Sequence, residues 1–164
     1  MASFSFDIVS EIDKAEMNNV FIQAEKEIQG RYDFKGTSAG INWLDDKKGL
    51  KLTGDNDWQV DAVLDIVRKK LAARGQSSKA LDLSKEKVTS NLKTTWEIPL
   101  KQGLDQPTAK RIAADIRTNA PKAKPQIQGD LVRVTSASKD ELQKVISLVR
   151  ENDYDTPLQF VNYR

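Results

Sequence analysis

The sequence predicts an α+β protein in which one order of elements, βαββαβ, occurs twice. Three observations predict it. Residues 51–68 align with residues 133–150 without a gap, and six apolar residues of the first segment, between Leu52 and Val67, meet apolar residues of the second. Residues 4–24 align in the same way with residues 96–116. Within these alignments the apolar residues recur at every second position where a strand is expected and at helical spacing where a helix is expected.

Each half opens with a strand followed by a helix. The strands are predicted at 4–9 and 93–100, where apolar and polar residues alternate as on a strand with one buried face. The helices that follow are predicted at about 13–29 and 106–119. Asp105 is placed to cap the second of these helices, and the proline in its first turn is compatible with a helix start.

Two hairpin strands, a second helix and a closing strand complete each half. The hairpin strands are predicted at 39–45 and 49–54 in the first half and at 124–128 and 131–136 in the second. The second helices are predicted at 57–73 and 138–151, and the closing strands at 80–84 and 158–163. This order is the ferredoxin-like split βαβ unit, a four-stranded antiparallel sheet with two helices on one face. The sequence therefore predicts tandem ferredoxin-like domains at 1–88 and 89–164.

The composition argues against an enzyme. The chain contains no Cys and no His, which removes thiol nucleophiles, the commonest general base and the commonest transition-metal ligand. The sequence has no phosphate-binding loop, nucleophile elbow or calcium loop, so we predict no catalytic site, metal or other cofactor. The chain starts without a signal-peptide pattern and has no apolar run that could cross a bilayer. We therefore expect a cytoplasmic protein without a membrane partner.

The RYDFKG segment at 31–36 lies in a part of the first half that the second half lacks. More residues separate the first helix from the next strand in the first half than in the second. The second half folds without these additional residues, so the shared fold does not explain the residue types of the segment. We therefore look for a functional explanation. If the segment is extended, its aromatic side chains point to one side and its charged side chains to the other. The candidate ligand-binding residues are Arg31, Tyr32, Asp33, Phe34, Lys35 and Gly36.

These residue types suit a nucleotide. An aromatic ring can stack on a base, Arg31 can bind a phosphate through two hydrogen bonds, and Lys35 can act as a point charge. Asp33 can accept hydrogen bonds from the edge of a guanine, and Gly36 allows a close backbone approach or a positive φ. Two other interpretations remain open. The rings could pack in the core above a solvated, self-paired charged edge, or the segment could form a subunit interface.

A basic stretch in the second half supplies further candidate contacts. The chain has 26 Lys and Arg against 24 Asp and Glu, a net charge of +2. This charge is compatible with a local anion site and is far from the strongly basic surface of a nonspecific nucleic-acid binder. Lys110, Arg111 and Arg117 lie on the helix predicted at 106–119, where they could contact phosphate or RNA. A solvated helix face explains the same residues.

Four stretches in order along nearly the whole chain resemble the bacterial YajQ family. They are SFDIVSEID near the start, RYDFKG at 31–36, QIQGDLVRVTS at 126–136 and the closing PLQFVNYR. The resemblance implies two tandem ferredoxin-like domains that exchange their first strands, so that strand 4–9 lies in the sheet of the second domain and strand 93–100 in that of the first. The internal repeat cannot reveal this exchange, because the exchanged strands occupy equivalent positions.

The resemblance also implies a function. The family is described as nucleotide-binding, with members that bind tRNA or purine nucleotides and some that bind cyclic di-GMP and act on a transcription regulator. It has no established catalytic activity. In this chain Ser136 to Lys139 replaces a more basic loop, but Arg133 and Lys139 remain as candidate phosphate contacts. We therefore expect a purine nucleotide or cyclic dinucleotide receptor, with a tRNA-binding protein or a purely structural protein as alternatives.

Overall fold

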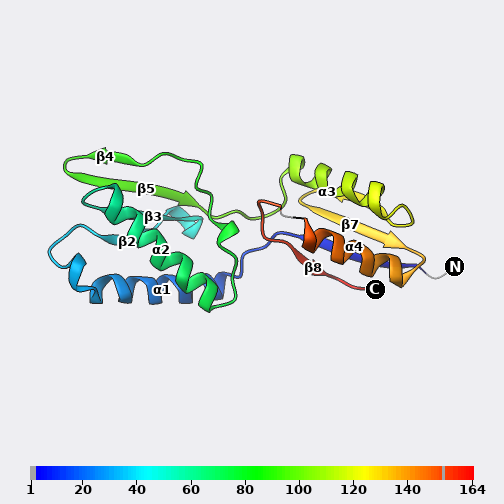
Figure 1. The fold of residues 1–164 in the computed structure, drawn as a ribbon, viewed down its shortest axis with the longest axis horizontal. Coiled ribbons are helices and arrows are strands. Elements are labelled where there is room, and N and C mark those ends of the chain that lie inside the picture. The colour runs from blue at the N-terminus through cyan, green and yellow to red at the C-terminus, as the bar shows by residue number, and fades with distance from the viewer. Residues whose placement is uncertain (1–2, 153) are drawn as a thin grey trace. The chain divides into compact units, whose positions relative to one another are not determined.

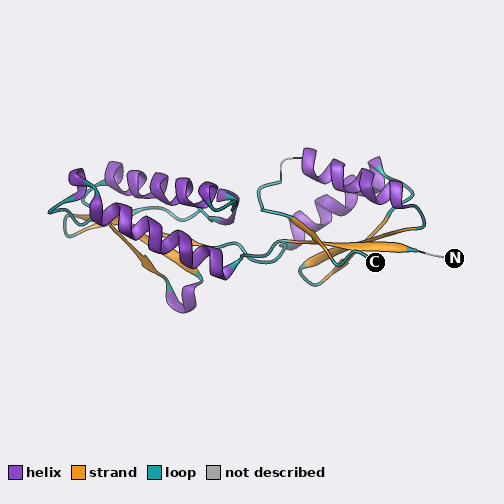
Figure 2. Ribbon diagram, turned by 90° about the horizontal axis from the view of Figure 1, so that it is seen from below, coloured by secondary structure: helices purple, strands orange, loops and turns teal. Residues whose placement is uncertain are grey.

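The fold was analysed in a computed structural model that describes residues 3–152 and 154–164. The chain forms two compact units (Figure 1). The central unit comprises residues 12–101, and the terminal unit combines the first strand with residues 102–164. Each unit holds one four-stranded antiparallel sheet. Figure 2 shows the two helices of each unit on one side of its sheet. The predicted α+β class with two such sheets is confirmed.

The central unit contains two helices and a sheet in the order β2-β3-β5-β4. Its helices are α1 (Lys14–Gly30) and α2 (Asp57–Ala73). Its strands are β2 (Gly40–Trp43), β3 (Gly49–Gly54), β4 (Val88–Ser90) and β5 (Lys93–Pro99). Three short 3-10 turns, η1 (Tyr32–Phe34), η2 (Asp45–Lys47) and η3 (Ser78–Ala80), lie in the connections.

The terminal unit repeats this architecture with the sheet order β6-β7-β1-β8. Its helices are α3 (Gln106–Asn119) and α4 (Lys139–Glu151). Its strands are β1 (Phe4–Val9), β6 (Lys124–Gln128), β7 (Leu131–Ser136) and β8 (Gln159–Val161). The sequence predicted the bounds of α2, α3, β3, β6 and β7 without error.

Each sheet contains one strand from the other sequence repeat. β1 pairs with β7 and β8, with Phe6 opposite Val134. β5 pairs with β3 and β4, with Ile98 opposite Leu50. The paired residues on the helix side are buried and belong to one core in each unit. Each compact unit therefore combines elements of both sequence repeats.

The helix starts follow from their capping residues. Asp13, Asn56, Asp105 and Ser138 each accept a hydrogen bond from a backbone N–H in the first turn of the helix that they precede. Such a bond satisfies one of the N–H groups that a helix start leaves without a partner. The predicted cap at Asp105 is therefore confirmed.

The closing strand of the first half differs from the prediction. Residues 80–84 do not form a strand; Ala80 ends the turn η3 and Leu81 makes one isolated bridge to Leu100. The fourth strand is β4, which joins β5 through Asn91 and Leu92, both with positive φ. Two consecutive residues of this conformation form the tight turn that matches the twist of a hairpin. Leu81 and Leu83 of this segment pack on the core of the central unit.

No helix in residues 3–152 or 154–164 combines the length and the apolar character that a membrane span requires.

Candidate functional site

The 31–36 segment lies in the connection between α1 and β2 of the central unit. This connection covers residues 31–39, whereas its counterpart in the terminal unit, between α3 and β6, covers residues 120–123. The excess predicted from the sequence repeat is therefore present. In Figure 1 this connection, the start of α2 and the turn between β4 and β5 lie at one end of the central unit.

The expectation of an extended segment is wrong. Tyr32, Asp33 and Phe34 form the turn η1, with the backbone N–H of Lys35 bonded to the carbonyl of Tyr32. The turn sends the two rings to different sides. Phe34 is 5% exposed and packs in the core of the central unit, whereas Tyr32 is 87% exposed. The hydroxyl of Thr37 donates to the Phe34 carbonyl at 2.6 Å and holds the turn on the core.

Two of the predicted charged residues are paired with each other. The Arg31 guanidinium donates to both carboxylate oxygens of Asp33, at 3.0 and 2.7 Å. It also lies 4.5 Å from the centroid of the Phe34 ring. The hydrogen bond from Arg31 lowers the pKa of Asp33. An exposed pair of this kind contributes little to stability, because water screens the two charges. The self-paired edge considered in the sequence analysis is therefore present at this pair.

Tyr32, Lys35 and Gly36 form the open part of the segment, which we call the Tyr32 site. The Lys35 Nζ atom lies 5.9 Å from the centroid of the Tyr32 ring. Gly36 has a φ of +75°, and no atom lies within 4 Å of the position that a Cβ would take. The positive φ at Gly36 is confirmed. An exposed ring, a cation and an accessible backbone therefore occur together.

The neighbouring loop is tied to the start of α2. The backbone N–H and the hydroxyl of Ser38 both donate to one oxygen of Asp55, at 3.0 and 2.6 Å. These two bonds are the main cause of the lowered pKa of Asp55, and the charge of Lys93 lowers it further. Trp58, in the first turn of α2, is 68% exposed.

The basic residues predicted in the second half are distributed over both faces of the terminal unit. Lys110, Arg111 and Arg117 lie on α3, where the Arg111 guanidinium lies 5.0 Å from the centroid of the Tyr154 ring. Arg133 lies on β7, in the strand register between two buried valines, so its side chain is on the sheet face that the helices leave open. These residues therefore do not form one continuous basic surface.

Arg133 is held by a buried carboxylate. Its guanidinium donates to both oxygens of Asp7, at 2.9 and 3.3 Å, and the Asn162 amide donates to the same carboxylate at 2.8 Å. The Asp7 side chain is 2% exposed, and the hydrogen bond from Arg133 is the main cause of its lowered pKa. Arg133 therefore has a structural partner in the strand β1.

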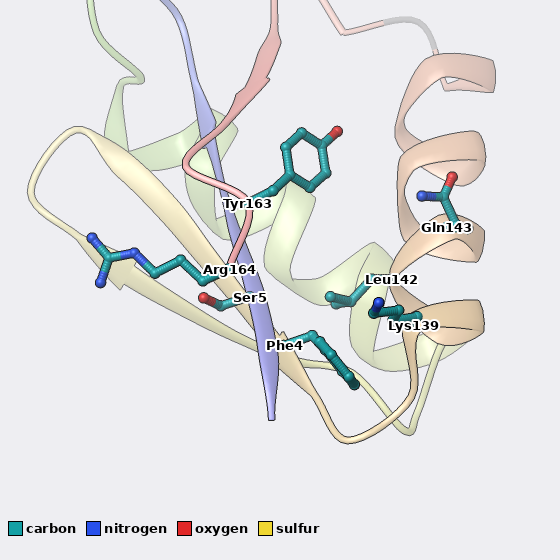
Figure 3. Close-up of a pocket in the computed structure, with 7 residues that line it drawn as sticks. All are labelled: Phe4, Ser5, Lys139, Leu142, Gln143, Tyr163 and Arg164. Carbon is teal, nitrogen blue, oxygen red and sulfur yellow. The ribbon is translucent and has the colours of Figure 1, made fainter. Parts of the chain in front are cut away.

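Lys139 lines a pocket of the terminal unit (Figure 3). Its Nζ atom lies 4.9 Å from the centroid of the Phe4 ring, and Tyr163 also lines the pocket. The sequence analysis selected Lys139 but neither of these rings. Its patterns are local, whereas the pocket joins both ends of the described chain to the start of α4.

The fold and these surfaces define a tandem ferredoxin-like protein in which a lysine lies near an aromatic ring in each unit, Lys35 near Tyr32 and Lys139 near Phe4. A family model described as nucleotide-binding protein YajQ-like matches residues 4–164. The chain belongs to this family. Relatives named nucleotide-binding proteins include those of Nocardia farcinica, 46% identical over 167 residues, and Streptomyces coelicolor, 44% identical over 165 residues; both matches cover 100% of each chain. The Chloroherpeton thalassium protein is 39% identical over 163 residues, which cover 99% of each chain.

Proposed function

We propose that this protein is a non-catalytic receptor for a purine nucleotide, which it binds at the Tyr32 site. One observation carries the proposal. The Tyr32 ring is 87% exposed beside the Lys35 ammonium, in a connection that is longer than its counterpart in the other unit. The names of the relatives, which are nucleotide-binding proteins, support the same class of ligand.

Each residue of the segment then has a role. The purine stacks on Tyr32, and Lys35 neutralises a phosphate beside the stacked base. Gly36 admits the phosphate to the backbone, because no side chain blocks the approach. The Asp33 carboxylate, although bonded to Arg31, retains lone pairs that can accept from a guanine edge. Phe34 fixes the turn from the core side.

Cyclic di-GMP is the ligand that we propose to test first. It presents two guanine bases and two phosphates, which match the ring, the carboxylate and the lysine of the site. We further propose that binding is passed to a protein partner such as a transcription regulator. The alternative of tRNA binding by the second half has less support, because its basic residues lie on two faces and Arg133 is paired with Asp7.

The test is isothermal titration of the full chain with cyclic di-GMP, GTP and a tRNA at low and near-physiological salt. Replacement of Tyr32 with alanine is expected to weaken dinucleotide binding by about tenfold or more, since stacking contributes about 1–3 kcal/mol per base. Lys35→Gln is expected to weaken binding and to reduce its salt dependence. Lys26→Gln removes an equal charge from an exposed position of α1 and serves as the control.

Unchanged dinucleotide affinity in Tyr32→Ala would contradict the proposed site. If neither cyclic di-GMP nor GTP binds while tRNA binds with a steep salt dependence, the function belongs to the basic residues of the second half. If no ligand binds at either salt concentration, the protein is a structural or interaction module.

A further inference from the structure

A pocket of about 350 Å³ lies beside α4 in the terminal unit (Figure 3). Its walls come from the start of β1, the first two turns of α4 and the segment after β8. These three segments are far apart in the sequence. The pocket belongs to a different unit from the Tyr32 site, and its existence does not depend on the function proposed above.

Two aromatic rings form the apolar walls. Tyr163 is stacked on the buried ring of Phe6, with 5.8 Å between centroids and 29° between planes, and it is 57% exposed. One face of the Tyr163 ring is therefore supported while much of the side chain remains accessible. Phe4 packs on the core cluster of the terminal unit, and Leu142, which is buried, lies between α4 and the rings.

The polar groups of the pocket have the chemistry of an anion site. Lys139 faces the Phe4 ring and makes no ion pair within residues 3–152 and 154–164. Gln143, one turn further along α4, adds an amide that can both donate and accept. No carboxylate side chain belongs to the described lining. A cation beside aromatic walls favours a ligand that is flat and negatively charged.

We propose that this pocket is a second binding site, for a purine nucleoside monophosphate. In this arrangement the base stacks on Tyr163, the Gln143 amide pairs with the base edge, and Lys139 neutralises the phosphate. The volume decides between ligand sizes. Small-molecule pockets span about 300–1,000 Å³, so this pocket is at the lower limit and suits one nucleotide and not a dinucleotide.

The experiment uses the full chain with GMP and AMP as ligands, and guanosine and inorganic phosphate as controls. Titration gives the affinity, and amide shifts of the ¹⁵N-labelled protein give the location. We expect saturable binding of a monophosphate with shifts at 4–5, 139–143 and 163. Tyr163→Leu is expected to weaken it by about tenfold or more. Lys139→Gln is expected to remove most of the preference for GMP over guanosine, whereas Lys144→Gln on the same helix leaves it unchanged.

Three outcomes would overturn the proposal: equal affinities in Lys139→Gln and Lys144→Gln, GMP-induced shifts confined to 31–38, or inorganic phosphate binding as tightly as GMP. Tyr163→Leu removes the stacking on Phe6 and could therefore destabilise the protein. In that case Lys139→Gln, which leaves this contact intact, still tests the proposal. Tyr32→Ala separates the two sites, because it should leave the shifts around Lys139 intact. Absence of binding at the Tyr32 site can therefore be distinguished from absence of binding at the pocket lined by Lys139.

Discussion

Replacement of Phe6 with alanine is expected to destabilise the terminal unit by about 3–5 kcal/mol. Phe6 is fully buried, and its ring contacts Phe160 edge-on at 5.7 Å and Tyr163 at 5.8 Å between centroids. The substitution leaves a cavity in the core of the terminal unit. Apart from the residues of β1, this core is formed by residues that follow position 100 in the sequence. The loss should appear in urea unfolding and in faster hydrogen exchange of the β6 and β7 amides.

Ile98→Ala is the matched variant for the other sheet. Ile98 is fully buried opposite Leu50, so its loss is expected to cost the central unit about 2–5 kcal/mol. The three tryptophans, at positions 43, 58 and 96, all belong to the central unit, so their fluorescence reports on its unfolding. The fluorescence transition should respond to Ile98→Ala far more than to Phe6→Ala. Faster exchange of the β2 and β3 amides in Phe6→Ala would contradict the observed strand pairing.

The order of elements could be predicted because it depends on local patterns. Apolar spacing and capping residues such as Asp105 identify α2 and α3 to the residue. The strand exchange could not be predicted in this way. Strands 4–9 and 93–100 have the same alternation of apolar residues, so either could fill the same place in either sheet. The resemblance to a family implied the exchange, which the pattern of residues left undetermined.

The candidate site was predictable as a position in the sequence but not as a geometry. The excess residues around 31–36 identified a segment that the shared fold does not require. Alternation of aromatic and charged residues suggested an extended strand, but burial of Phe34 in the core favours the turn η1. The pocket beside Lys139 gave no local signal, because Phe4 and Tyr163 come close to it only after the sheet has formed.

Replacement of Arg133 with methionine is expected to reduce the free energy of unfolding at neutral pH, because the buried Asp7 carboxylate loses its ionic partner. Methionine keeps much of the length of the side chain but leaves the Asp7 carboxylate, 2% exposed, with Asn162 as its remaining side-chain donor within residues 3–152 and 154–164. Removal of one partner of an ion pair is destabilising when the charge that remains is held away from water. Asp7→Asn should cost less, because the partly exposed Arg133 guanidinium can turn to water. Lys124→Met, on the neighbouring strand β6, is the control.

The pH dependence distinguishes this charge effect from a loss of packing. In the wild type the bond from Arg133 holds the pKa of Asp7 below its usual value of about 3.9, so this stability is present above pH 4 and is lost as the pH falls through the folded-state pKa. In Arg133→Met, burial without the ionic partner should raise the pKa of Asp7. As the pH falls, Asp7 is therefore protonated at a higher pH in the variant than in the wild type, and protonation removes the cost of the buried charge. The difference in unfolding free energy between wild type and variant should therefore shrink between pH 7 and pH 3. A difference that stays constant over this range would mean that Arg133 acts through packing and not through the charge of Asp7.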